Sequence, residues 1–338
     1  MNSQTSSLEF SHFPVMLSEI IQISNPKKGG LFVDCTFGGG GYSKALLEFQ
    51  KTKVIAIDRD SNVISIANKF KKKFKNRFQF YQLRFSQMET VLKKKENVDT
   101  IILDLGLSSI QLNNLDRGFS FKSKKNLDMT MGLTDKSAQY VINNLSESQL
   151  MSIIRILGEE KDAKKIARNI AKARVEKEIT RVDELVNIIE KSKKKNFSPK
   201  INPSTKTFQA LRIFVNKETT ELINGIIKAS QILKPGGKIL VVSFHSIEDK
   251  IIKYFFKNFS KNRSKPSRYL PEAQNDNFCL FENYSHKAIK PSKNEIKKNN
   301  HSRSAKLRYA TRSKQKFIFP TDLIKKFNKY LNLEAINV

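Results

Sequence analysis

Four consecutive glycines, residues 38–41, directly follow a short apolar run at residues 31–36. A glycine-rich turn between a strand and a helix lets the backbone approach a ligand closely and directs helix N-terminal amides at an anionic or polar group. A second apolar run ends in Asp58, some 20 residues beyond Gly38, where a carboxylate can bind two ribose hydroxyls. This combination predicts a nucleotide-like cofactor above a strand-turn-helix unit, with an ordinary tight turn as the alternative.

Further apolar runs rich in β-branched residues recur along the chain, separated by stretches long enough for helices. Such alternation predicts an α/β fold with a parallel sheet. The expected strands are residues 31–36, 54–58, 78–83, 100–105 and 238–245. Because the last of these comes more than 130 residues after the fourth, we expect a discontinuous α/β domain formed by residues 1–114 and 204–258.

The interruption, residues 115–203, has a helical period of apolar residues. Ser146 and Gln149 form a capping-box pattern at the start of one helix, and Thr180 and Asp183 repeat a cap pattern before another. A basic helix is expected between them. These patterns predict a helical insertion domain. Its basic helix indicates that the domain serves in RNA recognition.

Charge indicates the class of partner. The chain has 62 Lys and Arg against 32 Asp and Glu, a formal net charge of +30, which attracts polyanions. Residues 257–318 contain 16 basic and 4 acidic side chains. We therefore expect residues 259–338 to be a basic C-terminal arm, poorly packed over 260–318, that contacts nucleic acid together with the basic helix at 161–174. Compositional bias of the genome is the alternative source of lysine.

Several classes of protein are disfavoured. The two cysteines, Cys35 and Cys279, lie far apart without metal-ligand spacing, so we expect no metal site. No apolar run approaches the ~18 residues of a membrane span, and the first basic residue is Lys27, so we expect neither a membrane association nor a signal peptide. A cytoplasmic location is the resulting expectation.

Nicotinamide dinucleotides and S-adenosylmethionine both suit a glycine turn followed by an acid. The dinucleotide fingerprint requires a sixth-position glycine, where Ser43 stands, so S-adenosylmethionine fits better. The fourth predicted strand ends in Asp104, followed by Ser108 and Ser109, at the sheet edge where ligands of α/β folds bind. There Asp104 meets a ligand sulfonium or an amine, or caps the next turn.

The chain resembles the ribosomal RNA small subunit methyltransferase H family in the order and spacing of its motifs. The resemblance covers residues 12 to about 255. Residues 303–308 are similar to the family's basic tail, and residues 257–300 match poorly. Its motifs are HFPVML at 12–17, TFGGGGYS at 36–43, AIDRD at 56–60, LDLGLSS at 103–109, DRGFSF at 116–121, LDM at 127–129, TFQALRIFVN at 207–216 and SFHSIED at 243–249.

The resemblance implies a Rossmann-like, S-adenosylmethionine-dependent methyltransferase domain with an inserted helical domain. The implied reaction is methylation of the exocyclic N4 amine of a cytosine in the decoding region of 16S rRNA, within the small ribosomal subunit or its precursor. The implied cofactor contacts are Gly40, Gly41, Tyr42, Asp58, Phe85, Asp104 and Gln111. Without the family, Phe85 is expected in the core. Tyr42 departs from the family's usual histidine, and Ile110 stands where proline is common.

Methyl transfer to an amine requires alignment and a proton acceptor. The candidates near the sheet edge are Asp104, the Ser108-Ser109 pair, Asp128 and His245. We select His245 for its pKa range, with a structural strand-end histidine as the alternative. The target base must leave its stack. Phe119 and Phe121 would either stack on it or anchor the insertion. Methylation of DNA, and a ribosome-assembly factor that has lost catalysis, are the other functions considered.

Overall fold

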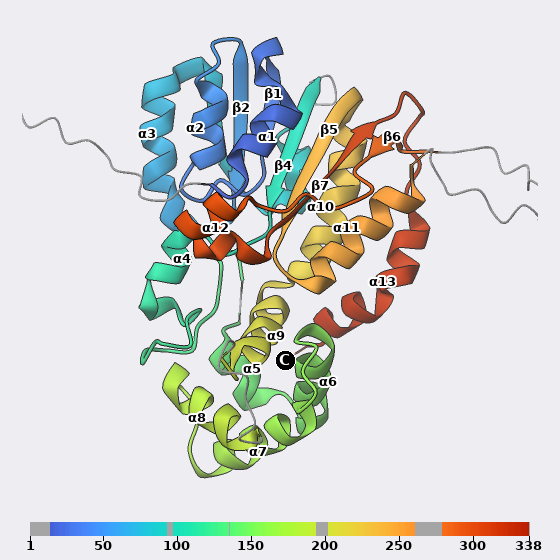
Figure 1. Cartoon of the computed structure of the whole chain (residues 1–338). Helices are drawn as coiled ribbons and strands as arrows, with labels where there is room; N and C mark the ends of the chain where they lie inside the picture. Colours follow the sequence, from blue (N-terminus) through green and yellow to red (C-terminus); the bar gives the residue numbers. More distant parts are fainter. Residues whose placement is uncertain (1–13, 93–96, 135, 194–201, 261–278, 338) are drawn as a thin grey trace, which may run out of the picture.

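The computed structural model describes residues 14–92, 97–134, 136–193, 202–260 and 279–337, which build a central seven-stranded sheet (Figure 1). The strand order is β3-β2-β1-β4-β5-β7-β6, in which the first five strands are parallel and β7 runs antiparallel to β5 and β6. The five predicted strands are confirmed. The strands are β1 Gly30–Asp34, β2 Thr52–Asp58, β3 Phe78–Gln82, β4 Val98–Asp104, β5 Leu233–Ser243, β6 Phe281–Tyr284 and β7 Lys306–Arg312.

Buried side chains alternate between the two faces of the sheet, as successive residues of a strand must. In β1, Phe32 belongs to the core under one face and Val33 to the core under the other. The strands are apolar on both faces because helices cover both, which explains their near-continuous apolar runs. The first face carries α1 Leu17–Ser24, α2 Gly41–Leu47 and α3 Ile64–Phe74, and the second carries α10 Glu218–Ile232 and α11 Ser246–Asn258 (Figure 1).

The insertion contains α5 Ala138–Asn144, α6 Glu147–Leu157, α7 Ala163–Glu176 and α8 Val182–Ser192, which lie beyond one end of the sheet (Figure 1). The predicted capping box of Ser146 and Gln149 is confirmed at α6. The second predicted cap is wrong. Helix α8 begins after Arg181, and the carboxylate of Glu184, rather than Asp183, accepts from the Thr180 and Arg181 amides at 3.0 and 3.1 Å.

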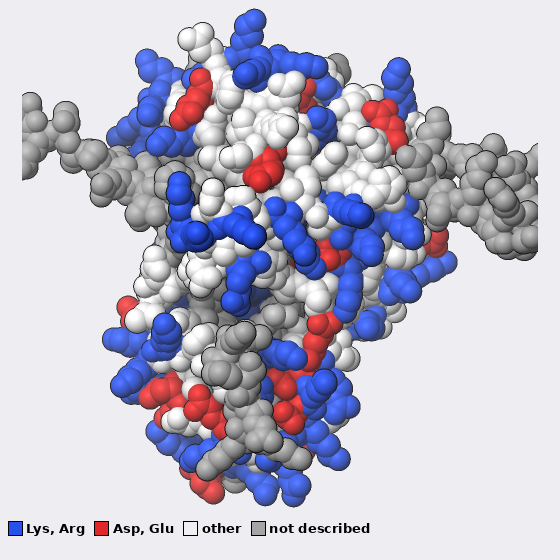
Figure 2. All heavy atoms as spheres, viewed as in Figure 1, with Lys and Arg blue, Asp and Glu red and all other residues white. Residues whose placement is uncertain are grey.

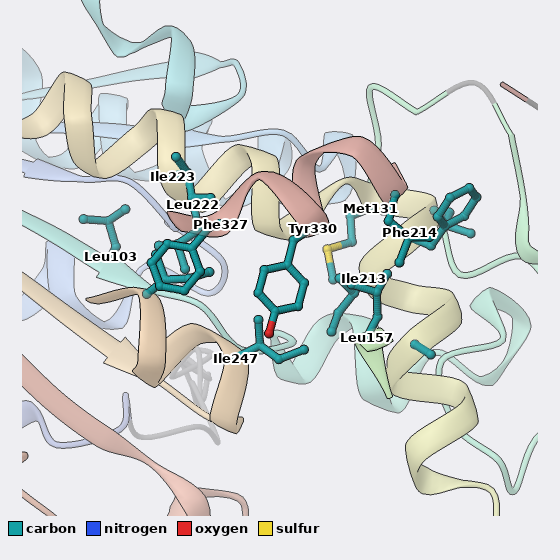
Figure 3. Close-up of a cluster of buried hydrophobic side chains, with 14 of the residues drawn as sticks. Leu103, Met131, Leu157, Ile213, Phe214, Leu222, Ile223, Ile247, Phe327 and Tyr330 are labelled. Atoms are coloured by element: carbon teal, nitrogen blue, oxygen red, sulfur yellow. The ribbon is translucent and has the colours of Figure 1, made fainter. Parts of the chain in front are cut away.

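The insertion shares its core with the α/β domain. Helix α9, Thr205–Asn216, packs against α6, so that Leu157 and Ile213 lie beside Ile247 of α11 and Tyr330 of α13 in one continuous cluster (Figure 3). Helix α13, Thr321–Glu334, thereby bridges both parts of the molecule. The insertion is consequently a fixed extension of the sheet domain in this structure, and its exact domain boundaries stay a prediction.

The expectation of a poorly packed arm over residues 260–318 is wrong for the described part of that segment. Strand β7 pairs with β5 along six consecutive residues, and β6 extends the sheet beyond it. Arg308 and Arg312 of β7 are 6% and 5% exposed. The sequence did not predict a strand here because these residues are charged. An arginine inside a sheet can nevertheless bury its aliphatic stem when its head group is paired. Short helices α4 Ser109–Asn113 and α12 Lys293–Lys298 complete the fold. None of the described helices could cross a lipid bilayer.

Candidate active site

A cavity of about 420 Å³ opens at the carboxyl ends of β1, β2 and β4. This is the sheet edge at which ligands of open α/β folds bind. Six of the predicted cofactor residues line it, namely Gly41, Tyr42, Asp58, Phe85, Asp104 and Gln111. Gly40 and His245 are not among its lining residues.

The glycine turn joins β1 to α2 and is held by the predicted acid. The Gly38 amide donates to Asp58 Oδ2 at 2.8 Å, and the Asp60 amide donates to Asp58 Oδ1 at 2.9 Å. Burial raises the pKa of Asp58, and the two amides oppose that rise. Each carboxylate oxygen retains a lone pair, so Asp58 can still accept a ribose hydroxyl while it fixes the turn.

Gly40 is required by the local packing. It has φ +78° as the residue before α2, and a Cβ there would lie 2.7 Å from the Phe70 ring and 3.0 Å from the Phe37 ring. Its neighbour Gly39 is exposed and lines the cavity, and a Cβ on it would meet no atom within 4 Å. Gly39 is therefore the position in this turn where an added side chain tests access to the cavity.

Asp104, at the end of β4, has an unusual environment. Its Oδ1 is buried without a hydrogen-bond partner among the described residues, and burial raises the pKa of the carboxyl to about 7. The Tyr42 hydroxyl lies 3.2 Å from Asp104 Oδ2 and 2.5 Å from the Val15 carbonyl oxygen. A carbonyl only accepts, so the hydroxyl donates its single proton there, and the contact to Asp104 is fully satisfied when Asp104 is protonated. A cation in the cavity would instead stabilise the ionised form.

Gln111 lines the cavity but already has two structural partners. It forms a capping box with Ser108 at the start of α4, and its Nε2 donates to Asp60 Oδ2 at 2.9 Å. Asp60 also pairs with Arg117 at the entry to the insertion. The side chain of Gln111 thus ties the wall of the cavity to the base of the insertion.

Phe85 lies between the cavity and α10. It begins the short 3-10 helix Phe85–Thr90, and its ring occupies the space where a Cβ on Gly225 would stand, 2.3 Å from the nearest ring atom. The next residue, Ser86, donates from its amide and its hydroxyl to the Glu221 carboxylate at 2.9 and 2.7 Å. These contacts keep an aromatic wall on the cavity, so Phe85 is both part of the packing and available to a ligand.

A second, acidic wall was not singled out in the sequence. Glu218 and Glu248 line the cavity, and Glu218 accepts two hydrogen bonds of 2.8 Å from the Arg212 guanidinium. Arg212 and Glu248 fall inside the motifs at 207–216 and 243–249, but nothing in the sequence indicated that the two segments face each other. Only the packing of α9, α10 and α11 brings them together.

His245 lies behind this wall. Its side chain is 10% exposed, and its Nε2 lies 3.0 Å from Glu248 Oε1. Glu248 Oε2 accepts from the amides of Phe244 and His245 at 2.8 and 3.2 Å. Burial alone would raise the pKa of Glu248, but His245, Arg212 and these amides hold it below its usual range. His245 therefore contacts the cavity wall through the lining residue Glu248.

Glu218, His245 and Glu248 each offer one ligand atom within 4.8 Å of the others. Arg212 already engages both oxygens of Glu218, so the group is an ion-pair network as the structure stands.

The two aromatic residues at the start of the insertion act as anchors. Phe119 is 7% exposed within the shared core, and Phe121 packs edge-on against Phe208 of α9 at a centroid distance of 6.5 Å. Neither ring lines the cavity.

A family model described as the MraW methylase family matches residues 9–313 of this chain. The chain belongs to the MraW methylase family. A relative from Parvibaculum lavamentivorans, named ribosomal RNA small subunit methyltransferase H, is 40% identical over 304 residues, 89% of each chain. The protein of the same name from Rickettsia akari is 42% identical over 306 residues, which cover 89% of this chain and 98% of that one. The predicted family is confirmed, and the seven-stranded mixed sheet agrees with the predicted α/β methyltransferase fold.

Proposed function

We propose that this MraW-family methylase transfers a methyl group from S-adenosylmethionine to the N4 amine of a cytosine in the decoding region of 16S rRNA, on the small ribosomal subunit or its precursor. A ribosomal substrate implies work in the cytoplasm. The observation that carries the cofactor assignment is the buried Oδ1 of Asp104, which has no hydrogen-bond partner among the described residues and lies in a cavity next to a glycine turn and Asp58. The names of the relatives support the rRNA substrate.

The residues present fit this cofactor. Asp58 would hold the ribose hydroxyls, Gly41 and Tyr42 of the glycine turn and α2 would face the methionine part, and Asp104 would meet a positive charge of the ligand. When bound, S-adenosylmethionine supplies an electrophilic methyl group. Phe85 and Gln111 would bound the remaining wall.

The chain's own residues would then position the base and receive its proton. An exocyclic amine donates hydrogen bonds, and Glu248 and Glu218 offer anionic acceptors on the wall of the cavity. A carboxylate that accepts from the amine orients the nitrogen and takes its proton once the methyl group is attached. His245, 3.0 Å from Glu248, would stabilise the ionised carboxylate and is a positioning residue in this scheme.

The test is a nucleoside map of 16S rRNA by mass spectrometry after incubation of unmethylated small subunits with the enzyme and labelled S-adenosylmethionine. The expected product is a single N4-methylcytidine. A methyl group on another base or on a ribose overturns the assignment, and calorimetric binding of the cofactor without any methyl transfer favours a non-catalytic assembly factor. A DNA substrate is tested with a deoxy-oligonucleotide of the same sequence, because recognition of the 2′-hydroxyl separates RNA from DNA.

A further inference from the structure

The charges of the cavity are segregated between its interior and its mouth. The described lining residues include five carboxylic acids, Asp58, Asp104, Glu218, Glu221 and Glu248, against one arginine, Arg59. The Arg59 guanidinium is directed at protein groups, donating to the Asn216 carbonyl oxygen at 3.0 Å. Such an interior suits a cationic ligand and a neutral base, and it repels phosphate groups.

One segment from the far end of the chain reaches this mouth. It consists of α12 and the 3-10 helix Asn300–Ser304, and we call residues 293–304 the rim. His301 of the rim is exposed and lines the cavity. In Figure 1, α12 is drawn across the strand ends, and His301 lines the same cavity as residues 110–113 of α4.

The rim is fixed to the rest of the protein. Glu295 accepts from the Met16 amide at 2.7 Å, which connects α12 to the start of α1. Ser302 is fully buried, and the residue after the rim, Ala305, is 2% exposed. The rim therefore presents its outward side chains from a defined backbone rather than from a loose tail.

Several of its exposed side chains are basic. Lys297, Lys298 and Arg303 are exposed, and none of them forms an ion pair with an acidic group in the described part of the chain. Figure 2 shows lysine and arginine side chains gathered in a band across this face, over the region of α12. The rim that carries these cations reaches the cavity through His301.

We propose that the rim binds the phosphates of the single-stranded RNA segment that presents the target base, with His301 at the boundary between base and backbone. This inference rests on the proposed function and specifies its RNA-binding surface. A base turned out of its stack enters the acidic cavity while its phosphates stay outside, so a basic rim around an acidic interior matches the charge distribution of a flipped nucleotide.

The experiment compares two triple variants with equal loss of charge. The rim variant is Lys297→Ala with Lys298→Ala and Arg303→Ala. The comparison variant is Lys164→Ala with Lys165→Ala and Lys172→Ala on α7, the basic helix that the sequence also predicts to contact nucleic acid, which lies at the end of the insertion remote from the sheet (Figure 1). Affinity for a fluorescent single-stranded RNA that contains the target sequence is measured at several salt concentrations.

The rim variant is expected to bind RNA roughly tenfold more weakly at physiological salt and to flatten the plot of log affinity against log salt by up to about 2, near 0.7 for each phosphate contact. Its melting temperature and calorimetric affinity for S-adenosylmethionine should match those of the wild type. The variant Lys297→Arg with Lys298→Arg, which keeps the charge, should bind like the wild type. The α7 variant should keep the wild-type slope if the rim, and not the insertion, binds these phosphates.

A rim variant with the wild-type slope overturns the inference, and if the α7 variant loses the affinity instead, RNA binds the insertion. The proposed function fails separately: wild-type enzyme that leaves every cytosine of the small subunit unmethylated refutes the reaction, whatever the rim variant does to RNA binding.

Discussion

The buried carboxyl group of Asp104 allows a prediction about how cofactor binding depends on pH. Its pKa is raised to about 7 by burial, so below that pH the carboxyl of the free enzyme is protonated and cannot stabilise a cation. We expect S-adenosylmethionine to bind more tightly as pH rises from 5.5 to 8, with proton release below about pH 7. Calorimetry in buffers of different ionisation enthalpy measures both quantities.

The matched variant for this measurement is Asp104→Asn, which keeps the shape and removes the titration. It should bind the cofactor more weakly than the wild type at pH 8, by about 1.5 to 3 kcal/mol for a lost charged hydrogen bond, and without the pH dependence. An unchanged pH profile in the variant would assign the titration to another group.

At the scale of elements, two neighbouring positions of the glycine turn have different roles: Gly40 is packed against aromatic rings, and Gly39 faces the cavity. Gly40→Ala should lower the free energy of unfolding by more than about 1 kcal/mol, because its φ of +78° and the Phe37 and Phe70 rings exclude a Cβ. Gly39→Val should leave the melting temperature unchanged and weaken cofactor binding roughly tenfold through a side chain at the cavity mouth. Thermal unfolding and calorimetry on both variants check this; the reverse pattern would contradict the structure of the turn.

Strand β7 provides a second prediction at this scale. Arg308 donates from Nε to Asp249 Oδ1 at 2.7 Å, and Lys306 lies 2.9 Å from Oδ2 of the same carboxylate. Because the Arg308 side chain is 7% exposed, Arg308→Ala leaves Asp249 with one partner and should lower the free energy of unfolding by about 3 kcal/mol.

Exposed Arg303 serves as the control for Arg308. Its replacement with alanine should change stability by less than about 0.5 kcal/mol in urea unfolding. Equal losses for both variants would mean that β7 is not held in the sheet by this pair. Within the basic C-terminal arm, the expected nucleic-acid contact is therefore limited to exposed cations such as Arg303, because Arg308 is buried against Asp249.

For the whole molecule, three buried carboxyl groups give stability an unusual dependence on pH. Burial raises the pKa of Asp34 to about 6 and those of Asp104 and Glu334 to about 7. An unfolded chain releases these protons near pH 4, so the folded state binds more protons between about pH 4 and 7. The stability associated with the three protonated groups is fully present below pH 4 and is lost as pH rises through 6 and 7.

We therefore expect the free energy of unfolding to fall between pH 5 and 7, by up to about 1.4 kcal/mol per pH unit for each group. Glu334→Gln should reduce that slope, and saturating S-adenosylmethionine should reduce it further by ionising Asp104. Urea unfolding at half-unit pH intervals measures the slope; a rise in stability over this range would contradict the assignment. Glu334 of α13 accepts hydrogen bonds from the Thr219 and Thr220 amides at the start of α10, at 2.9 and 2.7 Å. The variant therefore also tests how α13 is anchored to α10.

The amino-acid sequence by itself determined the parallel strands, the glycine turn with its acid and the helical insertion. These signals are local, since a two-residue period, a run of glycines and a capping box are each read within a few residues. Asp58 and Asp104 could also be predicted, because each ends a predicted strand and the carboxyl ends of parallel strands meet at one edge of the sheet.

Only the tertiary structure decided the rest, because it depends on residues distant in the chain. The sequence did not indicate strand β7 because it contains arginines, whose partners lie on α10, on α11 and in the segment before β6. The position of α11 puts Glu248, rather than His245, on the wall of the cavity. Arg212 and Glu218 form their ion pair across the junction of α9 and α10. Burial, ion pairing and charge segregation arise from three-dimensional proximity, which no local pattern in the sequence encodes.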